Sequence, residues 1–233
     1  MIEELEGKLV VSCQAPPGHP LANTRSIVAL CRCAAQGGAA GLRVEGAKGV
    51  RAARAAVDLP VIGIKKIWNG KHELSGARPA ITPEISDAFE LAAAGASIVA
   101  IEATMELHQE RASAYVKEVC RHVDALIMAD VSTLAEGLEA YNAGADLIAT
   151  TLSGYTSGSP YQHGPDLALV SELASRGIPT VAEGHITSPD QAVAALEAGA
   201  RFVVVGRAIT DPLERTTAFA SALATALPRK AEP

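Results

Sequence analysis

The stretch that decides the fold runs from Pro179 to Pro212 and reads PTVAEGHITSPDQAVAALEAGARFVVVGRAITDP. It predicts a strand over Thr180–Glu183, a helix between Ser188 and Gly199, and a second strand over Phe202–Val205. Ser followed by Pro is typical of a helix N-terminus, and Gly typically ends a helix. Four consecutive apolar residues are typical of a strand that is buried on both faces. This order of strand, helix and strand is the repeating unit of an α/β barrel.

A weak internal repeat extends this unit along the chain. Its segments share a helix end, a Gly-Ala corner and an apolar strand, and they read AAQGGAAGLRVE, LAAAGASIVAIEA, YNAGADLIATTL and LEAGARFVVVGRA. Repetition of one motif favours one architecture over two unrelated domains. We therefore expect eight strands, over Lys8–Cys13, Gly41–Val44, Pro60–Ile64, Ser97–Ile101, Ala125–Ala129, Leu147–Leu152, Thr180–Glu183 and Phe202–Val205.

Ala-rich helical segments, such as Thr133–Asn142 and Asp166–Ser175, alternate with these strands. The pattern predicts an α/β fold in which residues 1–233 form a single (β/α)8 TIM barrel of the phosphate-binding type. A doubly wound open sheet is the alternative. No GxGxxG motif follows the first strand, so the dinucleotide-binding version of that sheet has no support.

Composition excludes several classes of protein. The net charge of −6 argues against a general binder of nucleic acids or anionic membranes. No apolar run reaches the roughly 18 residues of a membrane helix, and the N-terminus lacks the pattern of a signal peptide. The four cysteines are too scattered for a disulfide framework. We therefore expect a cytoplasmic protein with no nucleic-acid or membrane partner.

Polar residues follow or end most of the predicted strands. They are Gln14, Arg43, Lys66, Glu102, Asp130, Thr151, Glu183 and Arg207. Strand ends of an α/β barrel meet on one face, which carries the active site, so we expect these side chains to converge. Two long loops rich in Gly, Ser and Pro, residues 68–83 and 153–165, should overhang this face, and residues 228–233 should be frayed.

Lys66 and Glu183 form the predicted acid–base pair. Lys66 directly follows the apolar segment PVIGIK, and burial lowers the pKa of a lysine, which frees a neutral amine. Its neighbour Lys65 should point the other way, because side chains alternate along a strand. Burial would raise the pKa of Glu183, so that it acts as an acid near neutral pH. A lysine and a glutamate on either side of one carbon, acidified by a neighbouring carbonyl, would epimerise that carbon.

A phosphate anchor is expected beside this pair. Gly184 and Gly206-Arg207 follow the last two strands, whose loops commonly bind phosphate in barrels. Arg43, Gln14 or Asp130 would position substrate oxygens, and Arg43 would also stabilise a developing enolate. The full set of expected substrate-binding residues is Gln14, Arg43, Asp130, Thr151, Tyr155, Gly184, Gly206 and Arg207.

Other candidate residues are weaker. Cys31 and Cys33 resemble a metal pair, but residues two apart on a helix face different sides, so we expect no metal. His185 follows Glu183-Gly184 and lies near the expected site, whereas an exposed loop histidine is the simpler interpretation of both His185 and His163.

Eight segments carry a family resemblance: VSCQAPPGHPL, GGAAGLRVE, LPVIGIKK, SIVAIEAT, IMADVST, ADLIATTLSGYT, TVAEGHITSP and VVVGRAIT. Through them the sequence resembles the N-acetylmannosamine-6-phosphate 2-epimerases, bacterial enzymes of sialic acid breakdown. The resemblance implies a (β/α)8 barrel that interconverts N-acetylmannosamine 6-phosphate and N-acetylglucosamine 6-phosphate without a metal or nucleotide cofactor. It also implies that Lys66 and Glu183 are catalytic, and that Gln14, Arg43 and Asp130 contact the sugar phosphate.

The sequence departs from the usual pattern of this family at three positions. Glu102 stands where Asp is usual in LDAT, His108 stands where many relatives carry Arg, and Asp211 stands where many read AITRP. An aspartate cannot supply a positive charge to a phosphate, so we expect Arg207 to be the anchor.

Two other functions use the same residues. Lys66 could be the Schiff-base nucleophile of an aldolase-like lyase that acts on a sugar phosphate, or the pocket could belong to a non-catalytic sugar-phosphate sensor. The pairing of Lys66 with Glu183 favours proton transfer over both. Barrels of this size often self-associate, so a homodimer is one of the states we consider.

Overall fold

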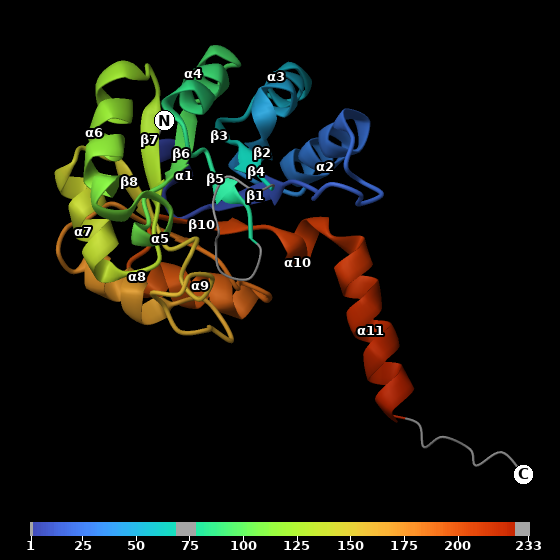
Figure 1. Cartoon of the computed structure of the whole chain (residues 1–233). Helices are drawn as coiled ribbons and strands as arrows, with labels where there is room; N and C mark the ends of the chain where they lie inside the picture. The colour runs from blue at the N-terminus through green and yellow to red at the C-terminus, as the bar shows by residue number, and fades with distance from the viewer. Residues whose placement is uncertain (1, 69–77, 227–233) are drawn as a thin grey trace, which may run out of the picture.

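A computed structural model describes residues 2–68 and 78–226, and a closed barrel of eight parallel strands forms its centre (Figure 1). The strands follow the order β1-β10-β9-β8-β7-β6-β3-β2 around the barrel. Their bounds are β1 (Leu9–Cys13), β2 (Gly41–Glu45), β3 (Val61–Ile64), β6 (Ile98–Glu102), β7 (Leu126–Asp130), β8 (Leu147–Ala149), β9 (Thr180–Glu183) and β10 (Phe202–Val205). The predicted (β/α)8 barrel is confirmed, and the open sheet is wrong because β1 pairs with both β2 and β10.

Helices precede, connect and follow the strands of the barrel, and most of them pack around it (Figure 1). They are α1 (Ile2–Leu5), α2 (Thr24–Gln36), α3 (Gly46–Ala56), α4 (Ile85–Ala93), α5 (Met105–His108), the 3-10 turn η2 (Gln109–Arg111), α6 (Ala112–His122), α7 (Leu134–Asn142), α8 (Leu167–Ala174), α9 (Pro189–Glu197), α10 (Arg207–Thr210) and α11 (Pro212–Ala226). Ser188 caps α9 by accepting the Gln191 backbone N–H, and Pro189 occupies its first turn, as the sequence predicts.

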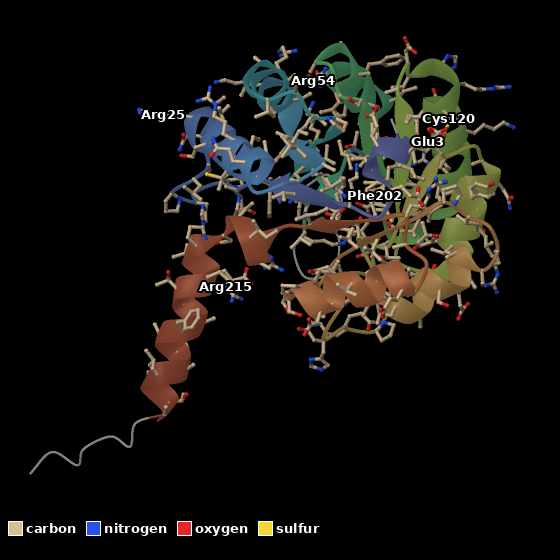
Figure 2. All side chains as sticks on the ribbon, turned by 180° about the vertical axis from the view of Figure 1, so that it is seen from behind. Glu3, Arg25, Arg54, Cys120, Phe202 and Arg215 are labelled. Atoms are coloured by element: carbon tan, nitrogen blue, oxygen red, sulfur yellow. The ribbon has the colours of Figure 1, made fainter. Side chains whose placement is uncertain are left out.

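Successive side chains of each strand point alternately into and out of the barrel, and this alternation divides the apolar core into two layers. Ile98 and Phe202 belong to the layer inside the barrel, and Phe202 (labelled in Figure 2) is fully buried there. Val99, the neighbour of Ile98, belongs instead to the layer between the strands and the helices, where Leu91 of α4 and Val116 of α6 also lie. The barrel interior is therefore filled with side chains, and only its rim has room for a ligand.

Two details of the predicted strands are wrong. The strand expected over Leu147–Leu152 ends at Ala149, because Thr150 turns the chain and its hydroxyl donates to the Glu183 carbonyl at 3.0 Å. The loop expected over residues 68–83 contains a short strand, β5 (Ala80–Ile81), which pairs antiparallel with β4 (Lys66–Ile67), the two residues just before this loop. The rest of that loop (69–77) and the predicted frayed tail (228–233) lie outside the described residues, and the single-domain organisation stays a prediction.

The last helix, α11, extends away from the barrel (Figure 1). None of its residues is buried, and Phe219 and Leu223 are each 67% exposed. Arg215, which is labelled in Figure 2, lies near the start of this helix. Across residues 2–68 and 78–226, we find no helix with both the length and the apolar character needed to cross a bilayer.

Candidate functional site

A cavity of about 460 Å³ opens at the carboxyl ends of the strands. Most of the residues predicted from the sequence line it: Gln14, Arg43, Lys66, Thr151, Tyr155, Glu183, Gly184, Gly206 and Arg207. The predicted Asp130 lies behind this wall, where it is fully buried. The cavity therefore brings together side chains from strands that are distant in sequence.

Arg43 is the centre of a buried network of ion pairs. It lies on β2, is 1% exposed, and forms ion pairs with Asp130 and Glu183. Its Nη1 also donates to Thr151 Oγ1 at 3.4 Å, and Thr151 Oγ1 donates to Asp130 Oδ1 at 2.7 Å. Asp130 thus orients Arg43 and Thr151 from behind, and they in turn contact Glu183.

Glu183 has the acidity of a neutral-pH acid–base group. Its pKa is raised from 4.5 to about 7, chiefly by burial and also by the nearby Asp130, whereas Arg43, Lys66 and Thr151 oppose the shift. Its side chain keeps 14% exposure, and it lines the cavity. Glu183 can therefore exchange a proton with a bound molecule near pH 7.

Lys66 lies on β4 beside the ring of Trp68, 5.8 Å from its Nζ. Burial lowers the pKa of Lys66 below 10.5; Arg43 and Arg207 act in the same direction, and Glu45 and Glu183 oppose it. Its neighbour Lys65 faces the other way, as predicted, and its Nζ pairs with Asp87 at 2.7 Å and with Glu90 at 3.0 Å.

The expected phosphate end lies where β9 and β10 meet the cavity. Gly184 has a φ of +102°, which disfavours residues with a Cβ, and a Cβ there would lie 3.3 Å from the Thr151 carbonyl oxygen. Arg207 is 65% exposed, and its guanidinium contacts Glu214 at 3.2 Å and the Tyr155 hydroxyl at 3.4 Å. The ring of Tyr155 stacks on His185 with 4.3 Å between centroids, and His185 also lines the cavity.

The three unusual positions have separate structural roles. Glu102 is fully buried and forms an ion pair with Arg78, and His108 stacks on Tyr115 with 4.2 Å between ring centroids. Asp211 lies at the cavity rim, 3.4 Å from His19 Nε2, and accepts the Glu214 backbone N–H at 2.9 Å. Asp211 therefore joins the loop after β1 to the start of α11.

Several residues of the site were not predicted from the sequence. Arg78 lines the cavity, but it sits in a stretch that reads only as a loop. Ser12 accepts a hydrogen bond from Gln14 Nε2 at 2.6 Å, and its place on β1 beside Gln14 could have identified it. Glu45 ends β2 and accepts the Lys66 backbone N–H; burial raises its pKa, while Lys66 lowers it. A carboxylate at a strand end was the available signal for Glu45.

The weaker candidates lie elsewhere. Cys31 is buried and Cys33 exposed on α2, in accord with the expectation that they face different sides. His163 makes an edge contact with Tyr161. Within the described ranges, no cluster of three or more His, Cys, Asp or Glu side chains is arranged to hold a metal ion.

Arg43→Met should raise the pKa of Glu183 above about 7, because it removes the cation that holds this pKa down. It should also lower the free energy of unfolding at pH 8 by about 3–5 kcal/mol, since Asp130 and Glu183 remain buried without their partner. NMR titration of the Glu183 carboxyl carbon and urea unfolding measure the two effects. The control Arg201→Met breaks a more exposed pair with Glu6 and should cost less than about 1 kcal/mol. An unchanged Glu183 pKa would contradict the described network.

Comparisons with known proteins place the chain in one family. Residues 27–225 match the model of the family NanE, described as "Putative N-acetylmannosamine-6-phosphate epimerase". A solved structure of the N-acetylmannosamine-6-phosphate 2-epimerase from Clostridium perfringens is similar to this chain, with a TM-score of 0.86 and 34% identity over 95% of each chain.

Two curated relatives differ in length. The "Bifunctional enzyme NanE/NanK" of Brucella melitensis is 46% identical over 230 residues, which are 97% of this chain and 43% of the relative. The chain therefore spans less than half of that bifunctional enzyme. The "Putative N-acetylmannosamine-6-phosphate 2-epimerase" of Caldanaerobacter subterraneus is 42% identical over 223 residues, which are 94% of this chain and 92% of the relative. Because the family model matches most of the chain, and because these relatives are 46% and 42% identical to it, the chain belongs to the NanE family.

Proposed function

We propose that this protein is an isomerase that interconverts N-acetylmannosamine 6-phosphate and N-acetylglucosamine 6-phosphate by moving a proton at C2. One observation carries the proposal: Lys66 and Glu183 line one cavity, and burial lowers the pKa of the lysine while it raises that of the glutamate to about 7. Membership of the NanE family supports this substrate. The Clostridium perfringens relative carries the same activity in its name.

The two catalytic groups share one proton. In the open-chain sugar the C1 aldehyde acidifies C2, so a neutral Lys66 or an ionised Glu183 removes the C2 proton from its side. The protonated partner then returns a proton from the other side, which inverts the carbon. The pair holds one proton in either of two states. In the first, the lysine is neutral and the glutamate is protonated. In the second, both groups are ionised. Both directions therefore use the singly protonated pair.

The remaining residues of the site would hold the sugar phosphate. Among the residues that the structure describes, Arg43 Nε and Gln14 Oε1 are buried without a hydrogen-bond partner. Both residues line the cavity, so we assign these atoms to substrate hydroxyl or carbonyl oxygens. Arg43 would stabilise the enolate charge. Arg207, which is 65% exposed next to Gly206, would bind the phosphate with Gly184, Thr151 and Tyr155 nearby.

A Schiff-base lyase is the second candidate function, because a buried lysine with a lowered pKa is also a nucleophile. Reduction by borohydride in the presence of substrate would trap Lys66 only in the lyase. A non-catalytic sensor has no use for an acid–base pair, and it would bind substrate without exchange at C2.

Proton NMR with N-acetylmannosamine 6-phosphate in D₂O should record conversion to the gluco epimer with deuterium at C2. Lys66→Ala and Glu183→Ala should each lower the rate by at least about 100-fold, since each removes one proton-transfer group. Lys65→Ala is the matched control: its side chain faces Asp87 and Glu90 on the outer side, and the rate should stay within about twofold of the wild type. A substrate that neither converts nor exchanges would sink the proposal for this sugar.

The rate should depend on pH as a bell in both directions of the reaction. Below about pH 7, protonation of Glu183 leaves both groups protonated and no base, so kcat/KM should fall about tenfold per pH unit. The alkaline limb should lie below 10.5, because the pKa of Lys66 is lowered. Initial rates from pH 5 to pH 10 measure both limbs. A flat profile across this range would rule out the paired mechanism.

We propose a cytoplasmic enzyme with no nucleic-acid partner, which the net charge of −6 and the sugar-phosphate pocket support.

We also propose a homodimer in which α11 contacts the second copy. Phe219 and Leu223 lie four residues apart on one face of this helix, each 67% exposed, and helix apolar faces are stable in water mainly when covered.

Sedimentation velocity should give a dimer of the 24.0 kDa chain. Phe219→Glu with Leu223→Glu should give a monomer, because two buried charges would oppose the contact. Glu197→Gln, a change on α9 at the barrel surface, should leave the dimer intact. A wild-type monomer at micromolar concentration would refute this assembly.

A further inference from the structure

We infer that Glu102 is a positioning residue for Lys66. It binds β5, the strand that pairs with β4, and β4 carries the catalytic amine. The inference rests on the proposed function, in which Lys66 transfers the proton. Glu102 is a buried strand-end carboxylate that the catalytic proposal leaves without a role.

Glu102 ends β6 and has no exposed surface. Its two oxygens accept hydrogen bonds from both terminal nitrogens of Arg78, at 2.7 and 3.0 Å. Oε1 also accepts the Thr104 hydroxyl at 2.6 Å, and Oε2 accepts the Ile81 backbone N–H at 3.1 Å. A buried carboxylate with this many donors has one fixed orientation, since each bond restrains it in a different direction.

The bond to Ile81 connects this carboxylate to the catalytic lysine. Ile81 is paired directly with Lys66 in the antiparallel β4–β5 hairpin. The hairpin is only two residue pairs long, and a pair of strands of this size is not stable without support. Arg78 comes just before β5 and donates to the same carboxylate. Glu102 therefore holds both the start of β5 and Ile81, the residue that pairs with Lys66.

A second set of bonds holds the hairpin from its outer side. Thr82 Oγ1 accepts the Lys65 backbone N–H at 3.1 Å, and the Lys65 carbonyl accepts the Thr82 N–H at 2.6 Å. Thr82 has a φ of +47°, an unfavourable backbone for a β-branched residue, and it is fully buried. These bonds fix the base of the hairpin, whereas Glu102 fixes the strand opposite Lys66. Loss of Glu102 should therefore loosen the hairpin without releasing it.

The role predicts a specific kinetic change. The residues proposed to hold the sugar phosphate lie outside β4 and β5, and Arg78, which lines the cavity and pairs with Glu102, is not among them. Substrate binding should therefore depend little on Glu102. Proton transfer requires the amine at a precise distance from C2, and displacement by about 1 Å costs up to about 100-fold in rate. Glu102→Gln should lower kcat by at least about tenfold and change KM by less than twofold.

Hydrogen–deuterium exchange supplies the structural readout. In Glu102→Gln the amides of Lys66 and Ile81 should exchange faster than in the wild type, while the amides of β7 keep their protection. Lys65→Ala is the control on the same hairpin, with kcat close to that of the wild type. Glu102→Asp keeps the charge opposite Arg78 and shortens the side chain by one methylene, so it serves if Glu102→Gln fails to fold. It should show the same faster exchange at Lys66 and Ile81 with a smaller loss of kcat.

The outcomes separate the two proposals. Wild-type kcat and wild-type amide exchange in a folded Glu102 variant would overturn the positioning role. Equal changes in kcat and KM would also overturn it, because they indicate general loss of the site. If Lys66→Ala retains exchange at C2, the proposed function fails, and this inference fails with it. If Lys66→Ala is inactive and the Glu102 variants are unaffected, only the inference fails.

Discussion

The pairing of Arg43 with two buried carboxylates is the interaction on which the site depends. Removing an ion from water costs several kcal/mol even after the protein relaxes, so a guanidinium at 1% exposure needs its partners. Asp130 and Glu183 supply them from β7 and β9, on the far side of the barrel mouth from β2. One side chain thus links three strands at the rim and fixes Thr151 and Glu183 relative to each other at the cavity wall.

The same dry surroundings shift the two groups of the proposed acid–base pair in opposite directions. Desolvation disfavours a charge of either sign, so it raises the pKa of Glu183 and lowers that of Lys66. Arg43 moderates the first shift and enhances the second. The pair holds one proton either with both groups ionised or with both groups neutral, and the free energies of these two states therefore approach each other. The proposed reversible proton transfer at a single carbon would benefit from this balance, because neither direction would have to recover a strongly disfavoured protonation state.

The barrel could be predicted from the sequence because its signals are local and repeated: apolar strands, Gly-Ala corners and helix caps. The strand-end side chains of the site follow from that topology alone. The end of β8 could not be predicted, since Thr150 and Thr151 are good strand residues and only their bonds to Glu183 turn the chain. The β4–β5 hairpin could not be predicted either, because two residues per strand are too few to show the apolar alternation that is typical of a strand. The role of Arg78 was hidden for a similar reason, because a long-range partner, Glu102, determines its position.

The seam of the barrel joins its first and last strands, with Leu9 of β1 in register with Val203 of β10. This contact has one of the largest sequence separations in the molecule, and such contacts form late, because the ordering of the intervening chain must come first. During synthesis on the ribosome, β1 is made long before β10, so the emerging sheet keeps an open edge until β10 is released. An unpaired edge of apolar strands can recruit other chains. Protection of this edge by a chaperone would therefore matter most in the interval just before the barrel closes.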